Sequence, residues 1–540
     1  MRNAVLVALT FAVLAGCTKP ATSSLGARHS WTQPHVLRIA DISDPDHLNP
    51  YLSEMDLSYD LSSLIYSFLV IADARGRLIG DLAVRVPSLA NGDIARDGRT
   101  YTYRLRRGVL WHDGVRFTSR DVVASWRAVM NPRNDTFEHE GYDRVARIET
   151  PDEFTVVVRL RERYPPFVSR FFAPLQEGGK PVLPAHVLER ERDFNAGELS
   201  AHPIGTGPFE FVAWARGDRI VLQRFERYFK GRPHLTRVEL RIIPNDQTVA
   251  VALQEHQLDL IVAPQTSLLD QYRATDGVTV ESAPWNSQAA LMIDARKPAL
   301  HELAVRRAIA VAIPYGVILR NVTRDLYPQA RNSLPPTALG YEQLPARRYD
   351  PAAAARLLDS AGWHAGPDGV RTRNGLRLAL TLVTIAGATN FERMALLLQS
   401  AFRAAGIDLT IKTYPYRTIF AAPSGPIYGG AYDLALYSDT VNWDPDVYNF
   451  TACDRWYPFG QNIFRFCDAR LDALERAGLQ TDDPATRATT YRAASRLMWS
   501  LVPYVPIYNG RRLIVRSSDL RNYSVNPTST PWWNAYQWDI

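Results

Sequence analysis

The chain is poor in cysteine, with three in 540 residues. A small disulfide-rich scaffold is therefore excluded. A zinc site is not expected either, because there is no short Cys-x-x-Cys pair and no histidine near Cys453 or Cys467. Net charge is also small, at +6 for 62 basic and 56 acidic residues. Since no arginine-rich tract interleaved with aromatics occurs, the charge pattern predicts no nucleic-acid partner.

Long apolar runs and catalytic motifs are missing as well. Beyond the N-terminus no run approaches the roughly 18 apolar residues of a membrane-spanning helix. The sequence has no glycine-rich phosphate loop, no Gly-x-Ser-x-Gly turn and no His-Glu-x-x-His helix. His139, between Glu138 and Glu140, is the histidine most suggestive of a metal ligand, but adjacent residues on a strand face opposite ways, which favours a solvated acidic loop. We expect no enzyme, no cofactor and no metal.

The first sixteen residues predict a cleaved export signal. Met1–Asn3 carries positive charge, and Ala4–Val13 is apolar but too short to cross a hydrocarbon core of about 30 Å. Leu14–Cys17 resembles a bacterial lipobox, which implies lipidation of Cys17 and cleavage before it; an ordinary signal peptide is the alternative. Residues 17–35 would then be a lipidated tether. We expect an exported protein on the periplasmic or cell-surface side, anchored to the membrane through Cys17.

The two remaining cysteines, Cys453 and Cys467, are fourteen residues apart. An exported chain folds in an oxidising compartment, which favours a disulfide between them. Closing a loop of this length contributes about 3 kcal/mol. Two free buried thiols are the alternative.

Strand and helix signals alternate along the chain. Period-two patterns predict strands, and Asp-Pro or Thr-x-x-acid patterns before apolar runs predict helix starts. The predicted strands cover residues 35–42, 101–107, 153–160, 238–243 and 407–413, and the predicted helices 118–130, 350–362, 389–406 and 483–499. Because single cores stop growing near about 250–300 residues, a chain of 540 residues predicts two lobes of mixed α/β structure.

A set of short segments occurs in a fixed order along the chain. The segments are Asp97–Gly108, Trp111–Gly114, Phe117–Val123, Gly205–Phe209, Val305–Ala308, Tyr349–Pro351, Ala361–Trp363, Asp444–Asp446 and Val502–Tyr508. Together they resemble the oligopeptide/dipeptide-binding proteins of bacterial ABC importers, which are extracellular solute-binding family 5. The resemblance extends from about Val36 to Ile540. The spacing of Cys453 and Cys467 is also similar to that of a disulfide in dipeptide-binding members.

The resemblance implies a two-lobed periplasmic-binding-protein-like fold, type II of the large class, with mixed sheets flanked by helices. Lobe I would comprise residues 36–282, with an extra subdomain at about 56–202, and residues 508–540 would return to it. Lobe II would comprise residues 283–507. The implied function is a monomeric extracytoplasmic lipoprotein that closes over a peptide or peptide-like solute and delivers it to the permease subunits of an ABC importer.

Two of the candidate ligand-binding places lie in lobe I and at the crossing between the lobes. Glu54 and Asp56 follow the first strand, in a region of ligand contact in the family; ordinary surface acids at a helix start are the alternative. Trp285 and Asn286 lie where the chain is expected to cross. An aromatic ring beside an amide suits a ligand wall, and core packing is the alternative for Trp285.

The third candidate place runs from Asp439 to Asp444. Many peptide-binding members hold the peptide's α-ammonium with an aspartate three residues before the acid of an acid-Pro pair, and here that position is Val441. Asp439 or Asn442 would substitute if the loop is remodelled. The candidates from this segment are Asp439, Asn442, Trp443 and Asp444.

The family's basic anchor for a carboxylate is also not evident in Thr384–Gly387. Desolvating an ammonium without a counter-charge costs several kcal/mol, so these departures open other ligand chemistries. The alternatives are a receptor for a non-peptide solute such as a sugar or a metal or haem complex, and an exported hydrolase or sensory lipoprotein.

Overall fold

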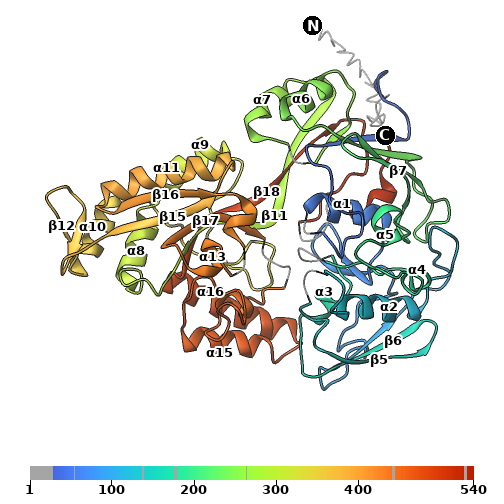
Figure 1. Ribbon diagram of the computed structural model, residues 1–540, viewed down its shortest axis with the longest axis horizontal. Helices are drawn as coiled ribbons and strands as arrows, with labels where there is room; N and C mark the ends of the chain where they lie inside the picture. The colour runs from blue at the N-terminus through green and yellow to red at the C-terminus, as the bar shows by residue number, and fades with distance from the viewer. Residues whose placement is uncertain are drawn as a thin grey trace, which may run out of the picture.

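The computed structural model describes residues 28–540, apart from residues 54, 137–138, 175–178, 263, 422, 441–443 and 528–531. Two lobes lie side by side and are joined by two long strands, β11 (Val278–Ile293) and β18 (Tyr504–Ser517) (Figure 1). The expected signal peptide and Cys17 fall outside the described residues. Within the described ranges, no helix combines the length and the apolar character needed to cross a membrane.

Among the described residues, ten strands form one sheet that extends through both lobes, in the order β16-β15-β17-β11-β18-β10-β1-β9-β8-β7. Parallel pairs (β1 with β9 and β10, β15 with β16 and β17) and antiparallel pairs both occur, so the sheet is mixed. Its other strands are β1 (Val36–Asp41), β7 (Phe209–Ala215), β8 (Arg219–Arg224), β9 (Arg237–Ile242), β10 (Leu260–Ile261), β15 (Ala379–Ile385), β16 (Asp408–Tyr414) and β17 (Leu434–Thr440).

Helices flank this sheet in both lobes (Figure 1). The mixed α/β class expected from the sequence is thereby confirmed. The helices are α1 (Asp56–Ile65), α2 (Ser119–Met130), α3 (Phe167–Arg170), α4 (Ala185–Leu188), α5 (Glu198–Ala201), α6 (Asp246–Gln254), α7 (Leu269–Arg273), α8 (Leu303–Val311), α9 (Tyr315–Thr323), α10 (Pro351–Ser360), α11 (Thr389–Ala404), α12 (Tyr416–Ile419), α13 (Pro426–Gly429), α14 (Tyr448–Thr451), α15 (Ala469–Gly478) and α16 (Pro484–Leu501), with 3-10 turns at Thr266–Leu268 and Ala535–Gln537.

Three small sheets complete the fold. In the first lobe, β4 (Thr100–Arg104), β5 (Val145–Asp152) and β6 (Thr155–Leu160) form the sheet β4-β6-β5, and β2 (Val70–Ala72) pairs with β3 (Leu78–Gly80). In the second lobe, β12 (His364–Ala365), β13 (Arg371–Arg373) and β14 (Leu376–Arg377) form a three-stranded sheet. We call the part of the first lobe from Asp97 to Arg170, which is built on the β4-β6-β5 sheet, the β4–β6 region.

Several helices begin where the sequence predicts them. The side chains of Thr118, Asp350 and Asp483 accept backbone N–H bonds at the starts of α2, α10 and α16, which confirms these three caps. The start of α11 differs, because its cap is Ala388, without a side-chain bond. There Glu392 reaches back to accept the N–H of Gly387 at 2.9 Å, two residues before Thr389, with which the sequence pattern pairs it.

Buried apolar residues divide between the lobes. One cluster in the first lobe runs from Leu37 in β1 to Ile540 and includes Trp532 and Trp538, so the C-terminal segment packs into the same core as the first strand. The clusters of the second lobe draw on residues between Ala289 and Tyr508. Each lobe therefore has apolar packing of its own.

The crossing strands are irregular where they pass between the lobes. The pairing of β11 with β18 shifts register between Pro284 and Gln288, and the pairing of β11 with β17 begins at Ser287. Gly510 lies on β18 at this place. A Cβ atom at Gly510 would lie 1.8 Å from the Ser287 hydroxyl oxygen, so this close approach requires glycine. The register break marks the crossing between the lobes.

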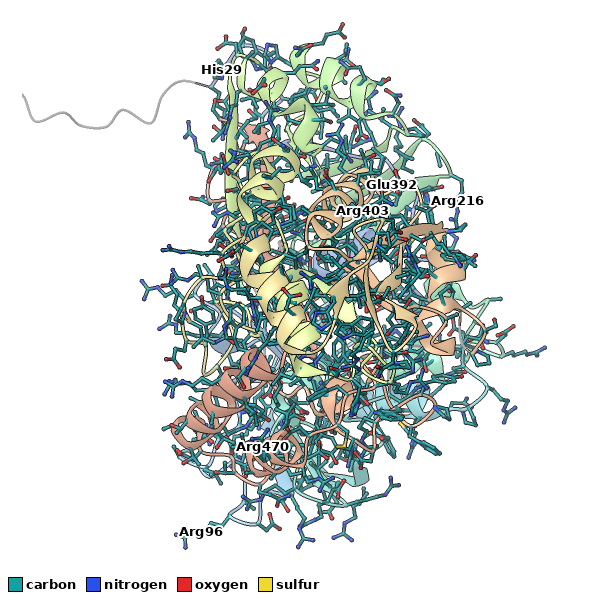
Figure 2. All side chains as sticks on the ribbon, turned by 90° about the vertical axis from the view of Figure 1, so that its left-hand side faces the viewer. His29, Arg96, Arg216, Glu392, Arg403 and Arg470 are labelled. Atoms are coloured by element: carbon teal, nitrogen blue, oxygen red, sulfur yellow. A yellow bond between two sulfur atoms is a disulfide. The ribbon has the colours of Figure 1, made fainter. Side chains whose placement is uncertain are left out.

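Charged side chains are spread over the surface. Figure 2 labels Arg96, Arg216 and Arg470, and these three lie at separate places on the molecule.

Candidate functional site

A cavity of about 650 Å³ lies between the two lobes. This volume is within the range of small-molecule sites, about 300–1,000 Å³. One wall comes from the β4–β6 region and carries charged side chains, namely Glu140, Asp143, Arg144, Glu162 and Arg163. The other wall comes from the second lobe, chiefly from residues 446–461. We call this space the interlobe cavity.

Four aromatic side chains stand among polar ones on the second-lobe wall of the interlobe cavity. They are Tyr428, Tyr448, Tyr457 and Phe459. The rings of Tyr428 and Tyr457 have centroids 5.4 Å apart, within the range of favourable aromatic pairs. Phe459 is 76% exposed and Tyr457 is 39% exposed, although both side chains are at the cavity. We call these four residues the aromatic wall.

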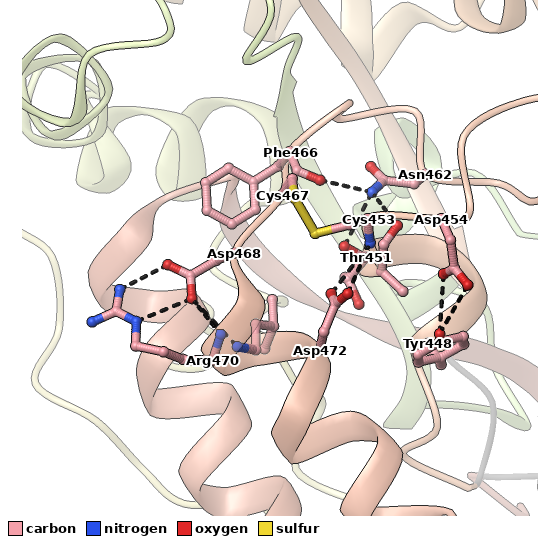
Figure 3. Close-up of a disulfide and its surroundings, with 12 residues drawn as sticks. Tyr448, Thr451, Cys453, Asp454, Asn462, Phe466, Cys467, Asp468, Arg470 and Asp472 are labelled. Carbon is pink, nitrogen blue, oxygen red and sulfur yellow. Dashed lines mark hydrogen bonds and ion pairs between the residues drawn. A yellow bond between two sulfur atoms is a disulfide. The ribbon is translucent and has the colours of Figure 1, made fainter.

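A disulfide lies at the base of this wall. In the structure the sulfur atoms of Cys453 and Cys467 are joined, with an S–S distance of 2.11 Å (Figure 3). Inside the closed loop, the buried Asn462 side chain donates to the carbonyl oxygens of Thr451, Ala452 and Phe466 at 2.9–3.0 Å. The loop that carries Tyr457 and Phe459 is thus fixed at both ends by a covalent bond and by one amide.

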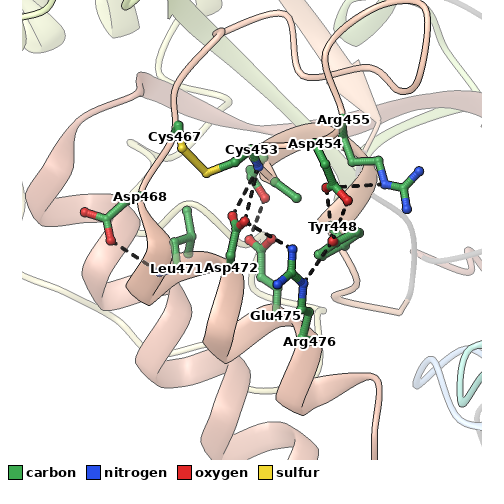
Figure 4. A network of polar contacts seen from close by, with 12 residues as sticks. Tyr448, Cys453, Asp454, Arg455, Cys467, Asp468, Leu471, Asp472, Glu475 and Arg476 are labelled. Carbon is green, nitrogen blue, oxygen red and sulfur yellow. Dashed lines mark hydrogen bonds and ion pairs between the residues drawn. A yellow bond between two sulfur atoms is a disulfide. The ribbon is translucent and has the colours of Figure 1, made fainter.

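A polar network continues from the disulfide to the aromatic wall (Figure 4). The Asp472 carboxylate accepts the N–H of Cys453 at 3.2 Å and lies 3.5 Å from the Arg476 guanidinium. Arg476 also donates to the Tyr448 hydroxyl at 3.0 Å, and that hydroxyl donates to Asp454 at 3.0 Å. The orientation of Tyr448 is therefore set by hydrogen bonds on both sides.

Two buried acids stand behind the aromatic wall. Burial, together with the nearby Glu140 carboxylate, raises the pKa of Asp446 to about 6 against the opposing effect of Arg170. Burial raises the pKa of Glu475 to about 8, although the Thr451 hydroxyl donates to its carboxylate at 2.5 Å. Because Asp446 lines the interlobe cavity, its charge state bears directly on which ligand groups it accepts.

A smaller cavity of about 60 Å³ adjoins this place in the second lobe. Its walls are mostly apolar, with Asp439 and Asp446 among them; the apolar lining includes Ala290, Met292, Val447, Phe450, Phe464 and Met498. Asp439 lies on β17 opposite Gln288 of β11. The structure thus brings the sequence-derived candidate Asp439 close to Asp446, which sequence reasoning did not single out.

Asp444 lies inside the second lobe. Arg487 of α16 donates to both carboxylate oxygens of Asp444, at 2.6 and 2.7 Å, and both side chains are buried. A buried carboxylate needs such a partner. Asp444 lines neither cavity, and its ion pair joins the start of α16 to the chain beside the aromatic wall.

The described candidates at the crossing and in the first lobe, Trp285, Asn286 and Asp56, line neither cavity. The guanidinium of Arg512 lies 3.9 Å from the ring centre of Trp285, and Arg512 also pairs with the buried Asp60 of α1 at 3.4 Å. Asn286 is buried and accepts a hydrogen bond from Thr337. Asp56 is exposed at the first turn of α1.

The remaining ligand candidates, Glu54, Asn442 and Trp443, lie outside the described residues. Sequence reasoning missed Glu140, Arg163, Tyr457 and Phe459. The last two lie between the cysteines, so the cysteine pair was the available signal for them. Across the described ranges no group of three or more His, Cys, Asp and Glu side chains is arranged to hold a metal ion.

Comparison with known proteins finds related sequences. The sequence model described as bacterial extracellular solute-binding proteins, family 5, middle region, matches residues 85–457. Di/tripeptide-binding protein 2 of Pseudomonas aeruginosa is 26% identical over 522 residues, which cover 92% of this chain and 94% of that protein.

Two solved structures have the same fold. Oligopeptide-binding AppA from Bacillus subtilis, in complex with a nonapeptide, aligns with a TM-score of 0.76 at 21% identity and covers 93% of this chain and 98% of its own. NikA from Brucella suis, in complex with Fe(III)-EDTA, aligns with a TM-score of 0.81 at 22% identity and covers 93% of this chain and 99% of its own. The two-lobed, periplasmic-binding-protein-like fold expected from the sequence is confirmed.

Proposed function

Since the chain belongs to the bacterial extracellular solute-binding proteins of family 5, we propose that it captures a peptide or peptide-like solute between its lobes. The lobes close on the solute about the crossing strands, and the closed form presents it to the permease of an ABC importer. The observation that carries this proposal is the interlobe cavity, whose two walls come from different lobes. The similarity to the di/tripeptide-binding protein supports peptide ligands.

Native mass spectrometry of protein purified from its own cells tests the ligand class. We expect a co-purified peptide or peptide-like mass that is released on unfolding. A thermal-shift screen with defined di-, tri- and longer peptides checks it independently, because a ligand at about 100 times its Kd adds about 2.7 kcal/mol of stability. Failure of all peptides to raise the melting temperature would remove the peptide proposal.

A receptor for a non-peptide solute is the second candidate. Val441 at the position of the family's ammonium anchor favours it, as does the Fe(III)-EDTA complex of the structurally similar NikA. Ferric and nickel chelates, sugars and haem belong in the same thermal-shift screen. Stabilisation by one of these without stabilisation by peptides would favour this candidate.

The proposal includes export and lipid anchoring at Cys17. The extracellular character of the family supports export, and the lipobox-like Leu14–Cys17 supports the anchor. Metabolic labelling with palmitate tests the anchor. We expect label in the wild type and none in Cys17→Ser, which would also leave the membrane fraction.

The proposal also includes the boundaries of the two lobes. We assign residues 36–282 and 508–540 to lobe I, with the extra subdomain at about 56–202, and residues 283–507 to lobe II. The separate apolar clusters support this division. Limited proteolysis of the native chain should leave fragments that end near the crossing, at about residues 283 and 508.

A further inference from the structure

The two walls of the interlobe cavity differ in chemistry. The first-lobe wall is charged, and several of its charges are already paired: Arg144 with Glu162, Glu140 with Arg170, and Arg163 with the carbonyl of Gln480. The second-lobe wall carries the aromatic wall together with polar side chains, among them Asp446 and Arg455. A solute that fills the cavity therefore meets mostly charged groups on the first-lobe side. On the second-lobe side it meets the four aromatic rings, with polar side chains such as Asp446, Asn449 and Arg455 beside them.

The exposure of the aromatic wall is unusual for side chains of this kind. Phe459 is 76% exposed on a loop that the Cys453–Cys467 bond and Asn462 hold in place. Removing apolar surface from water lowers the free energy. A fixed, exposed phenylalanine at a cavity therefore favours an apolar occupant. Because the loop is already ordered, little conformational entropy is lost when an occupant binds.

The arrangement of the rings in the aromatic wall favours an occupant with an aromatic group. Tyr428 and Tyr457 form a tilted pair with centroids 5.4 Å apart, and Phe459 is the most exposed ring beside them. Arg455 lies over the Tyr448 ring at 5.2 Å on the same wall. Ring faces of this kind discriminate an aromatic group from an aliphatic group of similar size, because aromatic pairs gain more than their buried area alone provides.

We propose that the loop between Cys453 and Cys467 selects solutes that carry an aromatic side chain. The aromatic ring packs against Phe459 and Tyr457, and the polar main chain of the solute faces the charged wall at Glu140 and Arg163. This inference rests on the proposed capture of peptide-like solutes. It assigns the selectivity to Tyr457 and Phe459 in this loop, and not to the candidates after the first strand or on the crossing strands.

A competition experiment tests this selectivity directly. The full mature chain is incubated with an equimolar set of Ala-Ala-Ala, Ala-Leu-Ala, Ala-Phe-Ala and Ala-Tyr-Ala, and the retained peptides are quantified by native mass spectrometry. We expect the two aromatic peptides to exceed Ala-Leu-Ala by about three- to tenfold, the size of a favourable aromatic contact. The leucine peptide separates ring packing from apolar burial.

Variants locate the selectivity. Phe459→Ala and Tyr457→Ala should reduce the aromatic-to-leucine ratio to within about twofold of one, while Ala-Leu-Ala stays bound. Tyr416→Ala is the matched control, because Tyr416 is 66% exposed on the same lobe but lines neither cavity. Its ratio should equal that of the wild type. Circular dichroism confirms that each variant is folded.

Three outcomes decide the proposal. A wild-type ratio near one, with peptides retained, overturns the aromatic selectivity and leaves peptide capture standing. An unchanged ratio in Phe459→Ala and Tyr457→Ala also overturns the assignment to this loop. Retention of none of the four peptides by the wild type counts against capture of short peptides itself, and the selectivity then fails with it.

Discussion

Asp444 and Arg487 form an ion pair at a position where the sequence predicts a ligand contact. Arg487 lies 43 residues further along the chain, at the start of α16. The cap of this helix is predictable from the sequence, but the place at which the helix packs is not. Burial then decides the role of the carboxylate, because an ion pair without water must satisfy its own charges. The sequence around Asp444 does not predict that its carboxylate is buried.

Arg487→Met should lower the free energy of unfolding by about 3–5 kcal/mol, because it leaves the Asp444 carboxylate buried without a counter-charge. The double variant Asp444→Asn/Arg487→Met should lose less, since no unpaired charge remains. Chemical denaturation of both measures the difference. A double variant no more stable than the single one would contradict the pairing as the cause.

The raised pKa of Glu475 should make the stability of the folded chain depend on pH. Burial raises its pKa from 4.5 to about 8, so between these values the folded chain keeps a proton that the unfolded chain has released. The free energy of unfolding therefore falls as pH rises across this window. Glu475→Gln does not titrate, and its advantage over the wild type should be near zero at about pH 4.5 and reach several kcal/mol near pH 8, at about 1.4 kcal/mol per pKa unit.

Melting temperatures of Glu475→Gln and wild type from pH 4.5 to 8 measure this trend. Glu255→Gln on the surface of the first lobe is the control and should follow the wild type throughout. A constant difference between Glu475→Gln and wild type over the whole range would contradict the titration of Glu475.

At the scale of elements, local sequence signals predicted the starts of several helices. The caps at Thr118, Asp350 and Asp483 fixed the starts of three helices, since the chemistry of a cap lies within four residues. The site was less accessible to prediction. Glu140 and Asp446 face one cavity although about three hundred residues separate them, and only tertiary packing brings them together. The type of Phe459 predicts a core residue, because phenylalanine is usually buried, and only its place between Cys453 and Cys467 points to the cavity.

Removing the disulfide tests the loop as an element. Cys453→Ala/Cys467→Ala should lower the free energy of unfolding by about 2–4 kcal/mol, because the unfolded chain regains the freedom of the open loop. Guanidinium denaturation with and without reductant measures it. Reductant should lower the midpoint of the wild type and leave the double variant unchanged; equal midpoints for wild type and double variant would contradict a stabilising bond.

At the scale of the molecule, the lobes also touch far from the crossing strands. Arg163 of the β4–β6 region donates to the carbonyl of Gln480 at 2.9 Å and lies 3.4 Å from the Asp482 carboxylate. Leu479 of the second lobe packs against the apolar cluster of the first. The Asp482 side chain is only 4% exposed, and burial raises its pKa. Opening of the lobes must break these contacts.

Arg163→Ala should therefore shift the lobes toward a more open arrangement. Spin labels at Val84→Cys and Leu396→Cys, both on exposed positions in different lobes, report the distance by electron paramagnetic resonance. We expect a longer and broader distance distribution than in the parent. Arg120→Ala is the control, because Arg120 pairs with Glu189 within one lobe. Identical distributions for all three proteins would show that this contact does not hold the lobes together.

The two ends of the described chain lie beside each other on the first lobe. The N–H of His35 donates to the carbonyl of Ile540 at 3.0 Å, and Arg28 pairs with Asp539 at 2.6 Å. A short engineered linker can therefore join the ends, and new ends can be opened in an exposed turn such as the one at Gly217. A permuted chain of this kind would carry a fluorescent reporter at the new ends, in an exposed hairpin of the first lobe.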